Sequence, residues 1–210
     1  MKFLDASWER NEHFSFFQSR KNPCFSVSFS INVAKVYAFK MQHGYRLTDC
    51  LYFAAMLAAN RVNSFRQRIV NLRPVEFESI DAAFTYIPKG RTLHCNCVAK
   101  FDAKFSVFSS NISAARALAD QNPTLCPEGG AAQSLIYFSC VPDIPILSAT
   151  NPWGDPWVDS VPRFLFGKMD DSGNTTMAIE ALHSFIDGVH LTEFYKLFTQ
   201  ITESPQQYFC

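Results

Sequence analysis

Residues 176–188 read TMAIEALHSFIDG. Over the first part of this stretch, alternate side chains share one face, namely Met177, Ile179, Ala181 and His183. An alternation with a period of two residues is typical of a β-strand. The Asp-Gly pair at the end is a favoured turn sequence. The stretch therefore predicts a strand that carries an imidazole at its end, beside a tight turn.

Two further patterns predict a long helix packed against a sheet. Residues 25–33, FSVSFSINV, alternate strictly between apolar and polar side chains, which predicts a second strand. Residues 48–69 then change to a helical repeat of apolar side chains, and Thr48 or Asp49 is available as the N-cap.

Shorter patterns of the same two kinds fill the rest of the chain. Strands are expected at residues 83–87, 93–101 and 134–141, and shorter helices near 112–119 and 192–202. Residues 142–162 contain five prolines and two tryptophans, which excludes regular secondary structure over most of this region. Together these patterns predict an α+β fold, with a large mixed β-sheet flanked by helices, in a single domain that spans residues 1–210.

Composition excludes several classes of function. The 210-residue chain carries 19 basic and 19 acidic side chains that interleave, so no basic footprint for nucleic acid is present. No apolar run reaches the roughly 18 residues that a membrane span needs. A glycine-rich phosphate loop is absent as well. The seven cysteines, an odd number mostly within apolar runs, suit reduced thiols in a reducing compartment. We therefore expect a cytoplasmic protein with neither nucleic-acid nor membrane partners.

His183 is the first candidate for a general base among the five histidines. A base that deprotonates a hydroxyl near pH 7 needs a fixed tautomer, and a nearby carboxylate such as Asp187 can hold the ring. The same residues also fit a half-buried histidine at a strand end, followed by an ordinary Asp-Gly turn. The segment alone leaves both interpretations open.

Three separated motifs resemble those of the chloramphenicol acetyltransferases. Residues 182–190, LHSFIDGVH, are similar to the H-x-x-x-D-G signature of that family. Residues 8–17, WERNEHFSFF, resemble its W-x-R-x-E-H-F-x-F-[FY] opening. Between them, residues 139–142 and the later Ser148 resemble a segment that leads to an oxyanion-stabilising serine. The resemblance covers about residues 8–198.

The resemblance implies a reaction and roles for four residues. It implies an acetyl-CoA-dependent O-acetyltransferase with a two-layer sandwich fold, in which acetyl passes directly to a substrate hydroxyl. His183 would be the general base, and Ser148 would donate a hydrogen bond to the tetrahedral oxyanion. Asp187 would pair with Arg10 and hold the catalytic loop in shape. No metal is implied.

The resemblance also implies partners. It implies a homotrimer with active sites between subunits, and a small-molecule acceptor that enters opposite CoA. Four residues match or approach substrate-binding positions, namely Phe17, Phe16, Cys24 and His94. An aromatic side chain in so Phe-rich a chain also fits a place in the core, so the role of Phe17 stays open.

Three departures bear on the acceptor. Leu182 stands where the family usually has a first histidine, and Leu165 stands where it often has a threonine. Residues 93–97, LHCNC, are more polar than an apolar wall for chloramphenicol. The acceptor could thus be chloramphenicol, with a role in antibiotic resistance, or another hydroxylated molecule. A rival interpretation is a noncatalytic relative that only binds and sequesters a ligand.

His94, Cys95 and Cys97 also suggest a zinc site. Alternation places His94 on the face opposite both cysteines, and no fourth ligand follows at a suitable spacing. A plain strand with buried thiols is the favoured interpretation.

Overall fold

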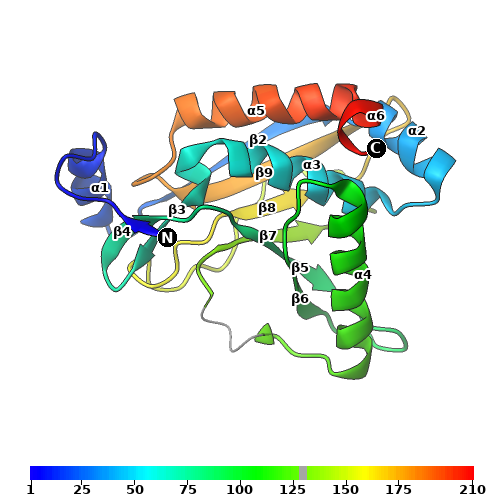
Figure 1. Cartoon of the computed structure of the whole chain (residues 1–210), viewed down its shortest axis with the longest axis horizontal. Helices are drawn as coiled ribbons and strands as arrows, with labels where there is room; N and C mark the ends of the chain where they lie inside the picture. Colours follow the sequence, from blue (N-terminus) through cyan, green and yellow to red (C-terminus); the bar gives the residue numbers. More distant parts are fainter. Residues whose placement is uncertain (128–131) are drawn as a thin grey trace.

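The structure is a computed structural model that describes residues 1–127 and 132–210. Its main sheet has six strands: β2 (Cys24–Asn32), β5 (Asp81–Tyr86), β6 (Cys95–Ala99), β7 (Leu135–Cys140), β8 (Arg163–Phe166) and β9 (Asn174–Leu182). Their order is β2-β9-β8-β7-β5-β6 (Figure 1). The pairs β5·β7 and β7·β8 are parallel and the other pairs are antiparallel. The predicted α+β fold with a large mixed sheet is confirmed.

Helices form the second layer. Figure 1 shows α3 (Leu47–Arg61) and α5 (Gly188–Glu203) over one face of the sheet. At one end of this layer, α2 (Ala34–His43) packs against α3, α5 and the short helix α6 (Pro205–Tyr208). A fourth helix, α4 (Phe105–Gln121), packs against the edge strand β6. The remaining elements are short: α1 (Asn11–Gln18), η1 (Asn63–Arg66), and a small sheet of β1 (Lys2–Phe3), β4 (Arg73–Glu76) and β3 (Gln67–Val70).

The core lies between the main sheet and α3. Every residue of α3 from Asp49 to Ala59 is buried, as expected of a helix that is covered on all sides. Phenylalanines fill much of the remaining space. The Phe194 ring of α5, for example, lies 5.0 Å from the Phe65 ring and 5.4 Å from the Phe164 ring. The high Phe content thus serves mainly to pack helices on the sheet.

The helix predicted over residues 48–69 starts within one residue of α3, but its predicted end and its predicted N-cap residues are wrong. The observed helix ends at Arg61, because Val62 is extended, and the apolar residues that follow belong to η1 and to the β3–β4 hairpin. A short buried strand and a buried helix share the same run of apolar residues, which explains the error. At the start, Arg46 precedes the first turn without a side-chain cap. Asp49 is instead bound by the Arg116 guanidinium.

Several other boundaries differ from the prediction. The helix expected near residues 112–119 is α4 and extends further in both directions, and the helix expected near 192–202 is α5. The sequence patterns did not predict α1, α2 or β8. Between Val141 and Pro162 the structure has no helix or strand, as the prolines predict.

The proline-rich segment covers part of the sheet face that is opposite the helices. Its carbonyls at Ile144 and Ala149 accept hydrogen bonds from Lys168 N and from Ser26 Oγ. Asn151 donates twice to the Glu180 carboxylate of β9, at 2.7 and 2.9 Å. The segment is therefore held over β8, β9 and β2.

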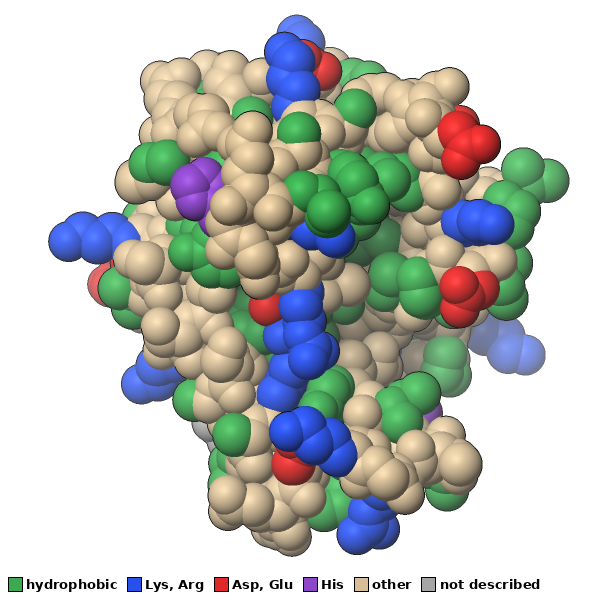
Figure 2. All heavy atoms as spheres, turned by 90° about the vertical axis from the view of Figure 1, so that its right-hand side faces the viewer, with side chains coloured by type: hydrophobic (Ala, Val, Ile, Leu, Met, Phe, Trp, Pro, Cys, Tyr) green, Lys and Arg blue, Asp and Glu red, His purple; other side chains and the backbone are tan. Residues whose placement is uncertain are grey.

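Charges of both signs lie on the face of the molecule that Figure 2 shows. Figure 2 shows Lys, Arg, Asp and Glu side chains interspersed with hydrophobic ones, consistent with a net charge of +0. Among the described residues, no helix has the length and apolar character needed to cross a bilayer.

Candidate active site

The backbone places His183 at the end of β9. Its N–H donates to the Pro23 carbonyl at 2.8 Å, which extends the β2–β9 pairing by one residue. The next residues form a turn, since Phe185 N and Ile186 N both donate to Leu182 O. The His183 imidazole is half-buried.

Two phenylalanines enclose the His183 ring. Phe17 of α1 stacks on it with centroids 4.1 Å apart and planes inclined by 18°. Phe25 of β2 lies against it with centroids 4.6 Å apart and planes inclined by 35°. Together they restrict rotation of the ring. The sequence did not single out Phe25, although its position at the start of β2 beside the His183 strand was the available signal.

A backbone carbonyl fixes the tautomer of His183. The Nδ1 atom lies 3.0 Å from the Ile186 carbonyl oxygen. A carbonyl can only accept, so this bond requires a hydrogen on Nδ1 and leaves Nε2 with a free lone pair in the neutral ring. The expectation that the Asp187 carboxylate orients the ring is wrong, because the Ile186 carbonyl occupies that place.

Asp187 instead binds Arg10. Arg10 Nη1 donates to Asp187 Oδ2 at 2.6 Å, and Arg10 Nη2 donates to the His183 carbonyl at 3.2 Å. The guanidinium thus joins the N-terminal motif to both ends of the turn after β9. Burial raises the pKa of Asp187, but the hydrogen bond from Arg10 and the nearby charges of His190 and Arg10 outweigh it, so that the pKa is lowered.

The same carboxylate caps α5. Asp187 Oδ1 accepts a hydrogen bond from Val189 N at 3.1 Å, while Asp187 N donates to His190 Nδ1 at 3.2 Å. These two bonds form a capping box, a feature that fixes the direction in which a helix begins. His190 therefore lies in the cap region.

The other predicted residues near His183 differ in their contacts. Phe16 meets Phe17 edge to face at 5.1 Å, yet it is 52% exposed and lies under the Arg20 guanidinium. Cys24 is half-buried opposite Leu182, and burial raises the pKa of its thiol to about 12. A thiol with so high a pKa is a poor nucleophile at neutral pH.

Ser148 and His94 are not among the residues that contact His183 in the described part of the chain. Ser148 is an exposed residue of the proline-rich segment, and no hydrogen bond joins it to His183 in the part of the chain that is described. His94 lies just before β6 and lines a cavity of about 400 Å³ on the sheet face, together with Tyr137 and Ser139. Among the described residues, the structure therefore joins Phe17, Arg10 and Asp187 to His183, and it joins neither Ser148 nor His94 to that group.

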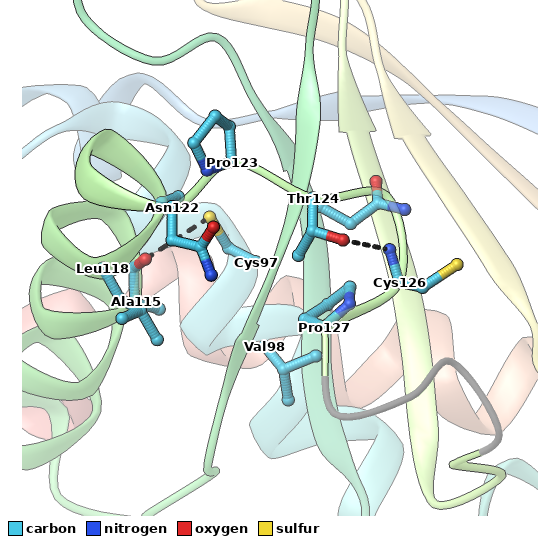
Figure 3. Close-up of a pocket in the computed structure, with 11 residues that line it drawn as sticks. Cys97, Val98, Ala115, Leu118, Asn122, Pro123, Thr124, Cys126 and Pro127 are labelled. Carbon is cyan, nitrogen blue, oxygen red and sulfur yellow. Dashed lines mark hydrogen bonds between the residues drawn. The ribbon is translucent and has the colours of Figure 1, made fainter.

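Neither His183 nor Ser148 lines any of five well-formed cavities in the described residues. One of these cavities, of about 500 Å³, lies between α4 and β6. Figure 3 shows its lining residues, among which Cys97 Sγ donates to the Ala115 carbonyl and Thr124 Oγ1 accepts from Cys126 N. This cavity contains none of the predicted catalytic residues. Within a single chain, His183 thus lies between Phe17 and Phe25 and outside these five cavities.

Metal ligands do not gather in the described residues. No group of three or more His, Cys, Asp or Glu side chains there could hold a metal ion. Cys95 and Cys97 are buried, whereas His94 is exposed.

Comparisons with known proteins agree on one family. A family model described as chloramphenicol acetyltransferase matches residues 2–198. Chloramphenicol acetyltransferase 3 of Escherichia coli is 19% identical over 97% of each chain, and the Bacillus pumilus chloramphenicol acetyltransferase is 20% identical over 96% of this chain and 93% of that protein.

Solved structures share the fold. A chloramphenicol acetyltransferase structure has a TM-score of 0.84 at 24% identity, covering 96% of this chain and all of the other. A probable dihydrolipoamide acetyltransferase from Listeria monocytogenes has a TM-score of 0.68 at 11% identity, covering 92% of this chain and 89% of the other.

Proposed function

Because the chain belongs to the chloramphenicol acetyltransferase family, we propose that it is an O-acetyltransferase that moves an acetyl group from acetyl-CoA to a hydroxyl of a small molecule. The observation that carries this proposal is the His183 imidazole, whose Nδ1 is bound to the Ile186 carbonyl and whose Nε2 is left free to accept a proton. The curated relatives named above are acetyltransferases of chloramphenicol, which supports the same reaction class here.

In the proposed mechanism, His183 Nε2 takes the proton of the acceptor hydroxyl as its oxygen attacks the thioester carbonyl. The new C–O bond forms, the C–S bond breaks, and the proton passes to the departing thiolate of CoA. A positioned general base contributes about 10²- to 10⁴-fold to the rate. The raised pKa of Cys24 favours this direct transfer over an acetyl-cysteine intermediate.

Ser148 is proposed to stabilise the oxyanion. Its hydroxyl is exposed and has no hydrogen-bond partner among the described residues, so it is available to donate to a substrate. Removing one donor of this kind costs about 10²- to 10³-fold in turnover. Arg10 and Asp187 are proposed as positioning residues, because their ion pair holds the turn that carries His183.

We infer that the single-domain chain forms a homotrimer, in which His183 of one subunit meets Ser148 and the sheet face of its neighbour. Within the described part of one chain, His183 makes no hydrogen bond to Ser148 and does not line the cavity beside His94, and these two observations support the inference. In the proposed mechanism, His183 and Ser148 act in a direct transfer that uses no metal.

A thiol-release assay with acetyl-CoA tests the proposal. Chloramphenicol and a panel of hydroxylated aromatics, sugars and antibiotics would serve as acceptors, with wild type, His183→Ala and His43→Ala compared. His43 lies at the C-terminal end of α2 and is the matched control. Acceptor-dependent release that requires His183 but not His43 is expected. Release that is equal in all three proteins would contradict the mechanism.

The alternative is a noncatalytic member that sequesters a ligand. The polar cavity beside His94 would fit that role as well. Such a protein would bind an acceptor-like molecule without releasing thiol, with or without His183.

A further inference from the structure

The cavity beside His94 has a lining that is unusual for a drug pocket. It lies on the sheet face opposite the helices, over β5, β6 and β7, and Asn151 of the proline-rich segment forms one wall. Its volume of about 400 Å³ is within the range of small-molecule sites. Such sites are mostly apolar with a few polar groups. Here the polar share is larger, because six of the eleven lining residues have polar side chains: Thr85, His94, Asn96, Ser139, Asn151 and Arg163.

Several of these polar groups have no partner in the described residues. The Tyr137 hydroxyl and the His94 imidazole make no hydrogen bond there. Asn96 donates through Nδ2 to the Leu125 carbonyl at 2.7 Å, which leaves its Oδ1 free to accept. Ser139 Oγ receives only a long hydrogen bond from Thr85 Oγ1, at 3.5 Å, so its own hydrogen is free. The cavity thus offers both donors and acceptors.

The charged side chains that border the cavity already have partners. The Arg163 guanidinium binds the Asp159 carboxylate and lies 3.6 Å from the Trp153 ring centroid. The neighbouring Glu180 carboxylate accepts two hydrogen bonds from Asn151. A charged ligand would gain no free counter-charge here, and a neutral one would meet no repulsion.

Tyr137 adds an aromatic surface to these polar groups. Its ring is half-buried beside Arg163, with the guanidinium carbon 5.6 Å from the ring centroid. An aromatic face for the C–H surface of a ring, next to groups that bind hydroxyls, is the combination that recognises a sugar.

We propose that this cavity holds the acceptor and that the acceptor is a neutral, polyhydroxylated molecule of the carbohydrate class. The inference rests on the proposed function, in which His183 of a neighbouring subunit completes the site. A site built to bind hydroxyl groups rejects an analogue that lacks them by about 10⁴- to 10⁵-fold. Tyr137 and Ser139 are the proposed specificity residues, and an acceptor with an apolar aromatic body is expected to be poor.

The test uses the full-length protein with methyl glycosides of glucose, galactose and mannose, with chloramphenicol as the apolar aromatic acceptor. Tyr137→Phe and Ser139→Ala each remove one hydroxyl from the cavity, and Tyr37→Phe makes the same change as Tyr137→Phe at an exposed position on α2. Thiol release gives kcat and KM, and ligand-observed NMR on His183→Ala measures binding of each glycoside without turnover.

We expect His183-dependent thiol release with at least one glycoside. Tyr137→Phe and Ser139→Ala should lower kcat/KM for it by about 10-fold or more, mainly through KM, and Tyr37→Phe should leave it unchanged. Chloramphenicol should be the poorer acceptor.

The remaining outcomes separate this inference from the proposed function. Thiol release with chloramphenicol could be fast, depend on His183 and be unchanged by Tyr137→Phe and Ser139→Ala. That result would support the proposed function and contradict the carbohydrate acceptor. Binding of a glycoside that is weakened by Tyr137→Phe, without any thiol release, would keep the ligand class and overturn the transferase. If no glycoside binds or reacts, the inference is wrong.

Discussion

Phe17 stacks on His183 with ring centroids 4.1 Å apart, and the two rings are nearly parallel. They come from motifs separated by most of the chain, one in α1 and one directly after β9. Together with Phe25 on another side, Phe17 limits the orientations of the imidazole. The proposed base is thus positioned by packing as well as by the Ile186 carbonyl.

Replacing Phe17 should reduce catalysis more than binding. Phe17→Ala removes the ring that stacks on His183, so the imidazole gains freedom and kcat should fall about 10-fold. Phe16→Ala is the matched control, because Phe16 is exposed and contacts Phe17 instead of the base. Steady-state kinetics with far-UV circular dichroism would check this, and equal losses in both variants would count against a positioning role for Phe17.

The meeting of the two motifs could be anticipated from the sequence, but the contacts that fix His183 could not. The resemblance predicted the pair of Arg10 and Asp187, which lie 2.6 Å apart. It did not predict the hydrogen bond between His183 Nδ1 and the Ile186 carbonyl. Every residue has a backbone carbonyl, so the identity of residue 186 gives no sign of this bond. Phe25 was predicted only as one of five apolar residues on a strand face, and nothing in an alternating pattern shows which of them touches a neighbouring ring.

Secondary structure was predictable where one face is clearly apolar. The strands β2 and β9 followed from strict alternation, whereas α2 was missed because only Val36 and Phe39 of its residues are buried. Most of β3, the first strand of the β3–β4 hairpin, was taken for the end of α3. The turn residues of this hairpin, Asn71 and Leu72, both have positive φ. Leucine rarely adopts this conformation, so the sequence does not predict a turn there.

Two substitutions of Asp187 should separate the ion pair from the helix cap. Asp187→Asn loses the charge that pairs with Arg10, but asparagine can still cap α5. We expect it to lower the free energy of unfolding by about 1 to 3 kcal/mol, between the values for exposed and buried pairs. Asp187→Ala also loses the cap and should cost about 1 kcal/mol more. Denaturant unfolding measures both, and equal costs would show that the cap contributes nothing.

Low pH should remove the contribution of the Asp187 charge to the free energy of unfolding. The pKa of Asp187 is lowered in the folded state from its ordinary value of 3.8. The stabilisation is therefore fully present above that value and is lost as the pH falls through the lower, folded pKa. The difference in unfolding free energy between wild type and Asp187→Asn should be constant from pH 7 to about 5 and shrink below pH 4. A difference that grows towards low pH would contradict the assigned direction.

Cys24 should be slow to alkylate and unnecessary for turnover. Burial raises the pKa of its thiol to about 12, so almost no thiolate exists at pH 8. Peptide mass spectrometry after a timed pulse of iodoacetamide should find the exposed Cys126 and Cys210 labelled first. Cys24→Ala should keep kcat within about 3-fold of wild type if transfer is direct. Loss of all turnover in that variant would instead favour an acetyl-cysteine intermediate.

Mixing two inactive variants should restore activity if the site lies between subunits. His183→Ala and Ser148→Ala each disable one side of the proposed site. When the two are unfolded together at equal amounts and reassembled at random, roughly a quarter of all sites, or about one site in each mixed trimer, should carry both intact residues. Thiol release by the mixture, compared with each variant reassembled alone, measures this. A mixture no more active than its components would place both residues in the same subunit's site.

The general-base role of His183 is the central claim, and chemical rescue tests it most directly. Turnover of His183→Ala would be measured at pH 7.5 with the best acceptor, with and without added imidazole, alongside circular dichroism and the oligomeric state. The account predicts a fall in kcat of about 10²- to 10⁴-fold with an unchanged fold, and partial recovery as imidazole supplies the missing base. A variant that keeps kcat within about 3-fold of wild type would contradict the claim.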